Sequence, residues 1–209
     1  MSPRGRALPP RLVLATGNAG KLREMRAILA PWSVDVRPQS EFTGAAAEET
    51  GLSFVENAIL KARFAAEASG LPAIADDSGL EVDALHGAPG IYSARYAGSG
   101  ADDAANNARL LLELDAMPDA ARAARYRCAM VFLRWPLDPS PLVRQASWEG
   151  RIARVPRGSG GFGYDPLFLV GDGEVTAAEM EPARKNEVSH RGKALRALVA
   201  ALTEPDAGP

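Results

Sequence analysis

The sequence predicts an α/β fold in which two lobes share one continuous β-sheet. A β-loop-α-β unit near the start of the chain favours this class, because such units pair their strands in parallel. Further strand-like and helical segments follow without internal repeats or a linker-like change in composition. We therefore expect one two-lobed domain over residues 11–203, after a disordered leader rich in proline and arginine (residues 1–10) and before a tail (residues 204–209).

The length and charge of the chain exclude several classes of protein. Its 209 residues suffice for one large domain, and a net charge of -2 leaves no basic field for nucleic acid or anionic membranes. Cys128 stands alone in an apolar run, so we expect a buried thiol and no intramolecular disulfide. No apolar segment reaches the length of a transmembrane helix or a signal-peptide core, which predicts a soluble, cytoplasmic protein.

The first predicted elements are a strand, a loop and a helix. Residues 12–15 predict a short buried strand that ends in the loop of residues 16–21. Apolar residues then recur at helical spacing, so we expect a helix from about Lys21 to just before Pro31. Alternation over residues 34–36 predicts the strand that completes the β-loop-α-β unit.

A second helix follows a loop over residues 39–51. Ser53 and Glu56 match a capping box, in which the serine caps the helix and the glutamate occupies its third position. We expect this helix to end at Gly70 and to carry an apolar face formed by Val55, Ala58, Ile59, Ala62 and Ala66.

Later elements alternate in the same way. A strand after Gly70 is expected to stop at Asp76-Asp77, and a Ser-Gly turn follows it. A helix capped by Asp102 or Asp103 would then turn four apolar residues inward: Ala105, Ala108, Leu111 and Leu112. Three more strands are expected over residues 126–135, 142–155 and 167–170. A final helix, capped by Ser189, would bury a stripe of Leu195, Leu198, Val199 and Leu202.

The acidic pair Asp76-Asp77 is the centre of the candidate site. Two neighbouring carboxylates repel and are costly to desolvate, so a fold rarely places them at the end of a strand without a nearby cation. Glu48 and Glu49 could complete an all-oxygen site with them, and Mg²⁺ prefers carboxylates together with water and phosphate oxygens. A solvated acidic turn and an exposed loop pair are the alternatives.

The loop of residues 16–21 is a candidate phosphate site. Two glycines join a strand to a helix there, so backbone N–H groups, a helix N-terminus and the Lys21 ammonium can all face an anion. The spacing is too short for a Walker A loop, and a plain strand-helix turn is the alternative. Lys61, one turn beyond Asn57 and away from the apolar face of its helix, could reach a phosphate or simply solubilise the surface.

The densest glycine cluster of the chain surrounds Phe162. A bulky apolar residue in such a loop suggests a platform for stacking a base, with Tyr164 and Asp165 beside it, or else a staple that holds the loop on the core. His190 and Arg191 would start the last helix, where cations oppose the helix dipole and so favour an anionic or accepting ligand, and Lys185 could join them.

These patterns together favour one kind of chemistry. Cys128 lies in an apolar strand, and no two histidines have metal-ligand spacing, so thiol catalysis and zinc are both disfavoured. Carboxylates, lysines and a glycine-rich loop indicate Mg²⁺ and a nucleotide polyphosphate instead.

Seven segments in one order resemble the inosine triphosphate pyrophosphatases, the enzymes for non-canonical purine nucleoside triphosphates, in their bacterial dITP/XTP branch. The resemblance covers residues 12–202 and rests on residues 15–21, 48–51, 54–61, 75–80, 87–95, 160–166 and 189–192. It implies a long, twisted mixed sheet with a central nucleotide-binding cleft between two lobes, and a homodimer. It also implies that ITP, dITP and XTP are hydrolysed with Mg²⁺ to the monophosphate and pyrophosphate.

The resemblance also assigns roles to residues. Asp77 would be the proton acceptor and a metal ligand, with Glu49 a second ligand and Asp76 close by, although Glu48 could exchange roles with Glu49. Lys21 and Lys61 would neutralise the departing pyrophosphate. The triphosphate would be held by Thr16, Gly17, Asn18, Ala19, Gly20 and Lys21, and Ser78 would contact the nucleotide. The purine pocket would comprise Phe162, Gly163, Tyr164, Asp165, Lys185, His190 and Arg191.

Two other functions stay open from the sequence. One is a related pyrophosphatase of the Maf type, which acts on pyrimidine or methylated nucleotides. The other is a nucleotide-binding sensor without catalysis, against which the intact acidic pair and Lys21 argue.

Overall fold

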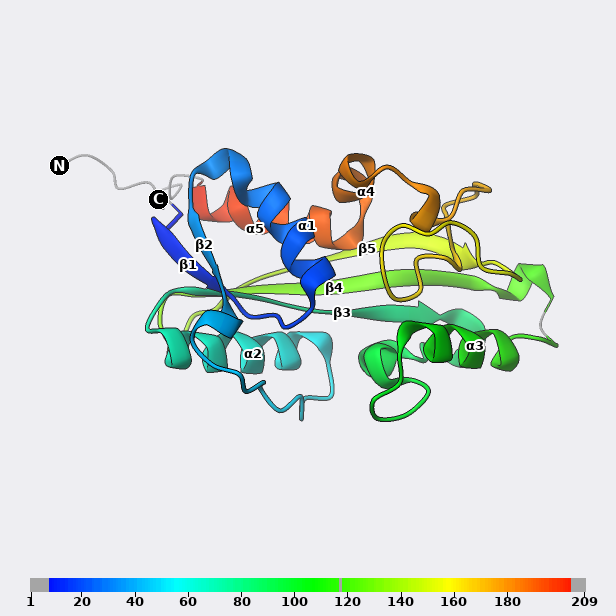
Figure 1. Cartoon of the computed structure of the whole chain (residues 1–209), viewed down its shortest axis with the longest axis horizontal. Helices are drawn as coiled ribbons and strands as arrows, with labels where there is room; N and C mark the ends of the chain where they lie inside the picture. The colour runs from blue at the N-terminus through cyan, green and yellow to red at the C-terminus, as the bar shows by residue number, and fades with distance from the viewer. Residues whose placement is uncertain (1–7, 117, 204–209) are drawn as a thin grey trace, which may run out of the picture. The chain divides into compact units, whose positions relative to one another are not determined.

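The computed structural model of the chain describes residues 8–116 and 118–203. Most of the predicted leader (residues 1–7) and the predicted tail (residues 204–209) lie outside this range. The described chain forms a mixed six-stranded sheet in the order β2-β1-β3-β4-β5-β6, with helices beside it, so the predicted α/β class is confirmed (Figure 1). No helix in the described ranges is long and apolar enough to cross a membrane.

The chain divides into two compact units. Unit 1 comprises the described residues of Met1–Asp77, Ala129–Gln145 and Arg191–Pro209, and unit 2 comprises those of Ser78–Cys128 and Ala146–His190. Three strands of ten or eleven residues contribute to both units: β3 (Ala73–Val82), β4 (Ala123–Leu133) and β5 (Leu142–Ile152).

The predicted β-loop-α-β unit is present at the start of unit 1. It consists of β1 (Arg11–Leu14), α1 (Ala19–Leu29) and β2 (Asp35–Pro38), and β1 pairs in parallel with both β2 and β3. Leu12 and Leu14 of the strand are fully buried, and Met25 and Leu29 of the helix are each 1% exposed. The apolar residues that predicted these two elements therefore form their buried sides.

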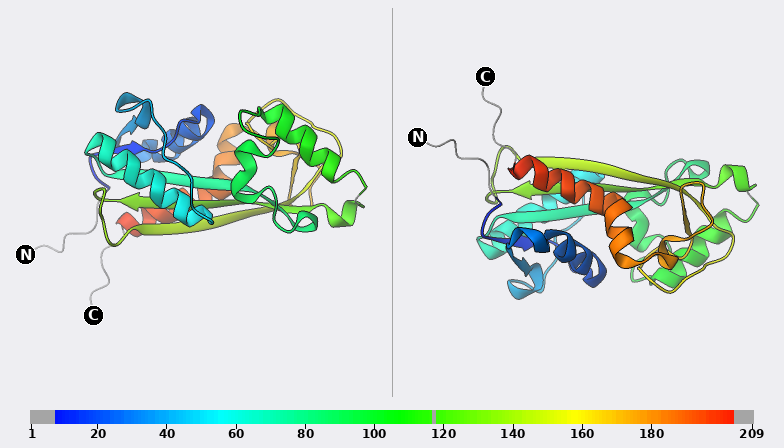
Figure 2. Two further views of the ribbon diagram at one scale, coloured as in Figure 1. Left: turned by 90° about the horizontal axis from the view of Figure 1, so that it is seen from below. Right: turned by 90° about the horizontal axis from the view of Figure 1, so that it is seen from above.

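Helix α2 (Phe54–Ser69) has both of its predicted ends. The Ser53 side chain accepts a hydrogen bond from the Glu56 backbone N–H, and Gly70 takes the left-handed conformation that ends the helix. Its buried face contains Ala58, Ala62 and Ala66 as expected. Figure 2 shows α2 on one face of the unit 1 strands, whereas α1 lies on the other face with α5 (His190–Thr203).

Strand β3 corrects one prediction. The sequence predicts a turn after Asp77, but the strand continues without interruption from Ala73 to Val82. Asp76, Asp77 and Gly79 are buried in it, and β1 and β4 flank it on either side. Residues that commonly form turns are extended here, beyond the register with β1, which covers Ala73 and Ile74. Nearby cations pair with the side chains of Asp76 and Asp77, which allows both carboxylates to be buried in the strand.

Unit 2 contains α3 (Asp103–Glu113), β6 (Phe168–Val170), which is antiparallel to β5, and the short helix α4 (Pro182–Val188). The sequence analysis did not predict α4. The core of unit 2 is rich in aromatic rings: Tyr126, Trp148, Tyr164 and Phe168. The final helix α5 begins directly after Ser189, and its predicted apolar stripe is buried to within 5% exposure.

Most of the predicted inner face of α3 is wrong: Leu111 packs against the unit 2 core as expected, but Ala105 and Ala108 are exposed. Leu112 is 77% exposed and Leu110 is fully buried, together with Asn106. Asn106 accepts a hydrogen bond from the Ala97 backbone N–H (2.8 Å) and donates to the Ala94 carbonyl (3.3 Å). The helix is therefore oriented by a polar anchor, which a pattern of apolar residues does not reveal.

Replacing Ser53 tests whether its side chain stabilises the start of α2. We expect Ser53→Ala to lower the free energy of unfolding by about 1 kcal/mol, because the first turn of α2 loses a hydrogen-bond acceptor. Urea unfolding at pH 7 measures the effect. Ser99→Ala, at an exposed turn, is the control and should stay within about 0.5 kcal/mol of the wild type. Equal stability of the two variants would contradict the capping role.

Candidate active site

Side-chain hydrogen bonds order the segment of residues 16–21 at the start of α1. The Asn18 side chain accepts from the Lys21 backbone N–H (2.9 Å), and Thr16 Oγ1 accepts from the Asn18 N–H (3.1 Å). The first turn of α1 carries no acidic residue, so its N-terminal dipole is not offset by a side-chain charge. Gly17 and Asn18 are exposed, which leaves room for a ligand at this end of the helix.

Asp76 is the centre of a buried ion network in unit 1. Its Oδ2 lies 3.0 Å from Lys21 Nζ and 3.3 Å from Arg191 Nε, and Arg191 Nη1 lies 2.6 Å from Glu24 Oε2. Burial alone would raise the pKa of Asp76, but the charges of Lys21 and Arg191 outweigh it and hold the pKa well below its usual range. Burial also lowers the pKa of Lys21, against the opposing charge of Asp76.

Asp77 takes part in a second network. Lys61 Nζ donates to Asp77 Oδ1 at 2.6 Å and to Glu49 Oε1 at 3.2 Å. Burial raises the pKa of Asp77, and the Lys61 charge offsets this only in part. Burial would lower the pKa of Lys61, but the neighbouring carboxylates outweigh it and raise this pKa. Glu49 is half-buried, whereas its neighbour Glu48 is exposed.

The two aspartates serve opposite faces of β3. Successive side chains of a strand point to opposite sides, and the partners agree with this: Asp76 meets residues of α1 and α5, and Asp77 meets α2. Among the described residues, no group of three His, Cys, Asp or Glu side chains could hold a metal ion. The carboxylates of Glu49 and Asp77 nevertheless converge on one cation, the Lys61 ammonium. Two carboxylates are a set that suits Mg²⁺, which takes its remaining ligands from water and phosphate.

The predicted base-binding residues of unit 2 gather around Asp165. This carboxylate is 3% exposed and accepts hydrogen bonds from the Phe162 backbone N–H (2.9 Å), Tyr126 Oη (3.2 Å) and Lys185 Nζ (2.5 Å). Lys185 Nζ also lies 4.9 Å from the centre of the Phe162 ring. Gly161 has a φ of +74°, and a Cβ there would lie 2.0 Å from Asp165 Oδ2, so only glycine permits this turn.

His190 forms part of an aromatic stack. Its ring lies parallel to Tyr126 (centroids 4.6 Å apart, planes at 8°) and also stacks near Trp148 (6.3 Å, 22°). The Tyr164 hydroxyl donates to the Ser93 carbonyl (2.8 Å), which ties this predicted pocket residue into the core of unit 2. The backbone N–H of Gly163 donates to the Asp103 side chain (2.6 Å).

The structure thus groups the predicted residues into two sets. In unit 1 the loop of residues 16–21 lies with Asp76, Asp77, Lys61 and Glu49, and Arg191 belongs to this set through Asp76. In unit 2 the residues around Asp165 form the second set, and Ser78 lies half-buried on β3. Sequence analysis missed three participants: Glu24, Tyr126 and Trp148. Glu24 lies one helical turn beyond Lys21, a spacing that could have identified it.

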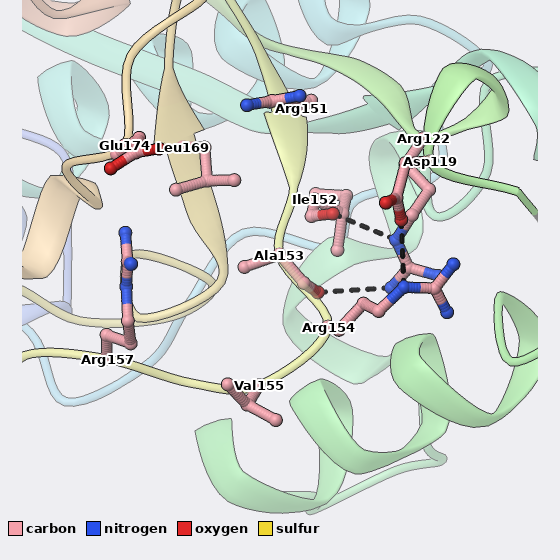
Figure 3. A pocket seen from close by; sticks show the side chains of 10 residues that line it. All are labelled: Asp119, Arg122, Arg151, Ile152, Ala153, Arg154, Val155, Arg157, Leu169 and Glu174. Atoms are coloured by element: carbon pink, nitrogen blue, oxygen red, sulfur yellow. Dashed lines mark hydrogen bonds and ion pairs between the residues drawn. The ribbon is translucent and has the colours of Figure 1, made fainter.

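No predicted site residue lines a cavity of about 320 Å³ in unit 2. Figure 3 shows Arg122 beside Asp119 and Arg154, with Arg157 on the other side of the cavity. Arg122 is 2% exposed, and its guanidinium donates to the backbone carbonyls of Leu114 (2.7 Å), Ile152 (2.9 Å) and Ala153 (3.1 Å). These bonds give Arg122 a structural role at the end of α3 and β5.

Comparison with known proteins identifies the family. A model of the Ham1 family matches residues 12–201. The chain belongs to the Ham1 family. It is 60% identical to a dITP/XTP pyrophosphatase of Thioalkalivibrio sulfidiphilus over 192 residues, 92% of this chain and 98% of that protein. A dITP/XTP pyrophosphatase of Vibrio cholerae is 55% identical over 194 residues, 93% and 97% of the two chains.

Solved structures support the same family. A HAM1 protein from Coxiella burnetii superposes with a TM-score of 0.84 at 49% identity, over 92% of this chain and 98% of that one. A nucleoside-triphosphatase / dITP/XTP pyrophosphatase from Mycobacterium abscessus gives 0.72 at 43% identity, over 90% and 98%. The predicted resemblance of this chain to the dITP/XTP branch of the inosine triphosphate pyrophosphatases is therefore confirmed.

The Asp76 network makes a prediction about stability. We expect Asp76→Asn to lower the free energy of unfolding at pH 7 by roughly 3–5 kcal/mol, because Lys21 and Arg191 stay buried without their shared counter-charge. The folded pKa of Asp76 is lowered, so its stabilisation is present above the ordinary carboxyl pKa of about 3.9 and is lost as pH falls below it.

Urea unfolding between pH 7 and pH 3 would measure this effect, and the gap between wild type and Asp76→Asn should narrow toward the acid end. Asp172→Asn, at an exposed loop position, is the control and should change stability by no more than about 0.5 kcal/mol. A pH-independent gap would contradict the ionic role of Asp76.

Proposed function

We propose that this Ham1-family chain hydrolyses non-canonical purine nucleoside triphosphates (ITP, dITP and XTP) to the monophosphate and pyrophosphate. Such an enzyme removes deaminated purines from the nucleotide pool and so keeps them out of DNA and RNA. The observation that carries the proposal is the position of Asp77, which is buried on β3 in contact with Lys61, a residue that also contacts Glu49. This arrangement occurs in a Ham1-family chain whose relatives are named dITP/XTP pyrophosphatases.

Asp77 is the proposed general base. Its raised pKa makes it a better proton acceptor than an ordinary aspartate, provided that it is ionised when water attacks near the α-phosphate. Lys61 holds the Asp77 carboxylate in one position, which fixes the direction from which a proton is taken. A titratable group whose pKa is shifted by burial and by a specific charged partner is a candidate for a functional site.

The proposed cofactor is Mg²⁺, and the residues present fit it. Glu49 and Asp77 would hold the ion, since their oxygens already converge on one cation. Asp76, the third residue predicted at the metal, instead pairs with Lys21 and Arg191 on the other face of β3 and would support the site from there. When bound, the ion would supply positive charge to the phosphates and lower the pKa of a water molecule. The choice of Glu49 over Glu48 is supported by the contact of Glu49 with Lys61.

The triphosphate would be held by the loop of residues 16–21. Backbone N–H groups at the start of α1 and the Lys21 ammonium offer donors to phosphate oxygens. Lys21 and Lys61 would then neutralise the charge that develops on the departing pyrophosphate. Ser78, next to Asp77 on β3, would contact the nucleotide.

Selection of the base would rest on the oxygen at C6 of the purine. Hypoxanthine and xanthine carry an oxygen there that accepts hydrogen bonds from donors such as His190, Arg191 or backbone N–H groups. The amino group of adenine would leave those donors unpaired, at roughly 1–3 kcal/mol for each buried group. Phe162 would stack on the base, with Gly163, Tyr164, Asp165 and Lys185 shaping the pocket around it.

Three further properties belong to the same proposal. Residues 11–203 would act as one two-lobed domain, and the chain would work as a homodimer. Its compartment would be the cytoplasm, where nucleotide pools reside, and buried Cys128, a free thiol, is compatible with that setting.

A panel of nucleoside triphosphates tests the activity. We expect pyrophosphate release from ITP, dITP and XTP to exceed that from ATP and GTP by at least about 100-fold, because several buried donors discriminate together. Release should require added Mg²⁺. Preference for dTTP or UTP would instead support a Maf-type enzyme, and binding of ITP without release would support a sensor.

Asp77→Asn tests the base. We expect turnover of ITP to fall by at least about 100-fold while KM changes only a few-fold, because the variant keeps the shape of the side chain but cannot accept the proton. Steady-state kinetics at saturating Mg²⁺ measure this. Glu48→Gln, beside the proposed ligand but exposed, is the control and should behave as wild type. A fully active Asp77→Asn enzyme would refute the assignment.

A further inference from the structure

We propose that Asn57 is a positioning residue, which holds the segment of residues 49–51 so that Glu49 faces Asp77. This inference rests on the proposed function, because Glu49 matters only if it serves the metal. Asn57 is fully buried in the first turns of α2, and its Oδ1 accepts a hydrogen bond from the Gly51 backbone N–H at 2.8 Å.

Gly51 fits against α2 too closely for any side chain. A Cβ at this position would lie 2.6 Å from Glu56 Cβ and 2.8 Å from Asn57 Oδ1. The backbone conformation of Gly51 does not itself demand glycine, so close approach to the helix is the reason for this residue. The contact thus requires an amide side chain at position 57 and a glycine at position 51.

The segment is held on α2 at two points. Lys61, one turn beyond Asn57, contacts the Glu49 side chain, whereas Asn57 contacts the backbone two residues further along. The Lys61 contact is an ion pair, and it competes with any other cation or any phosphate that these residues bind. The Asn57 contact is neutral and independent of that competition, so it keeps the backbone next to Glu49 in place when Lys61 changes partners.

Asn57 is not optimised for stability alone. Gly51 is a donor, so the Asn57 atom facing it must be Oδ1, and Nδ2 is then a buried donor without a hydrogen-bond partner among the described residues. An unsatisfied buried donor destabilises a fold. Violations of this kind are expected at functional positions, where geometry is maintained at some cost in stability.

Asn106 in unit 2 provides a matched control. It is also a buried asparagine on a helix, and its Oδ1 accepts from a loop backbone N–H, that of Ala97, at the same distance of 2.8 Å. Asn57→Ala and Asn106→Ala therefore both remove a hydrogen bond from a loop backbone N–H, and Asn106→Ala also removes the donation to the Ala94 carbonyl. Only the former lies beside the proposed metal ligands.

Mn²⁺ is the probe, titrated into the full-length protein without nucleotide and followed by the electron paramagnetic resonance of the free ion. We expect Asn57→Ala to weaken Mn²⁺ binding about 10- to 100-fold, the effect usual for a residue that orients a metal ligand, and Asn106→Ala to change it less than twofold. The Mg²⁺ concentration that half-activates ITP hydrolysis should rise in parallel, with a smaller change in kcat at saturating Mg²⁺.

Gly51→Ala disrupts the same hydrogen bond by changing the donor residue, and it replaces Asn57→Ala in the test if that variant does not fold. It should weaken Mn²⁺ binding to a similar extent, and the double variant should lose no more than the worse single variant, because both remove one interaction. Equal Mn²⁺ affinity of Asn57→Ala and Asn106→Ala would overturn the inference, as would a wild-type protein that binds no Mn²⁺. Neither result would decide the proposed function, which the nucleotide panel tests separately.

Discussion

Two adjacent carboxylates lie buried in the middle of a sheet, and each needs a cation on its own face of the strand. Asp76 and Asp77 are 1% and 6% exposed on β3, and transfer of an unpaired carboxylate out of water is far too costly for a fold to tolerate. Because strand side chains alternate, each carboxylate makes its direct ion pairs on its own face of the strand. Lys21 and Arg191 therefore pair with Asp76, and Lys61 pairs with Asp77.

This requirement determines what surrounds β3 in unit 1. Helix α1 must present Lys21, and α5 must carry Arg191 in its first turn near the strand. Helix α2 must turn Lys61 toward the strand, although the buried residues of α2 are mostly small and apolar. The same lysines are the groups that a triphosphate would engage. In the proposed function, the ion pairs that stabilise the free protein would also keep these cations in place for an anionic ligand.

Unit 2 follows the same physical rule with a different set of partners. Asp165 is buried, and it is satisfied by an ammonium, a phenol and a backbone N–H. These bonds hold the Phe162 loop against Lys185 and give it a defined shape despite its glycines. Arg122 shows the converse case, a buried cation stabilised by three backbone carbonyls.

The sequence by itself determined the α/β class, the caps of α2 and the residues from which the candidate site is drawn, because periodicity, capping chemistry and local motifs are short-range signals. It placed a turn after Asp77 and the wrong face of α3 inward, since burial of Asp77 depends on Lys61 and orientation of α3 depends on Asn106. Only the tertiary structure decided that Asp76 and Asp77 serve different faces, that Arg191 pairs with Glu24, and that Glu49 rather than Glu48 meets Lys61. Those are contacts between segments far apart in the chain, and no local pattern encodes which of them form.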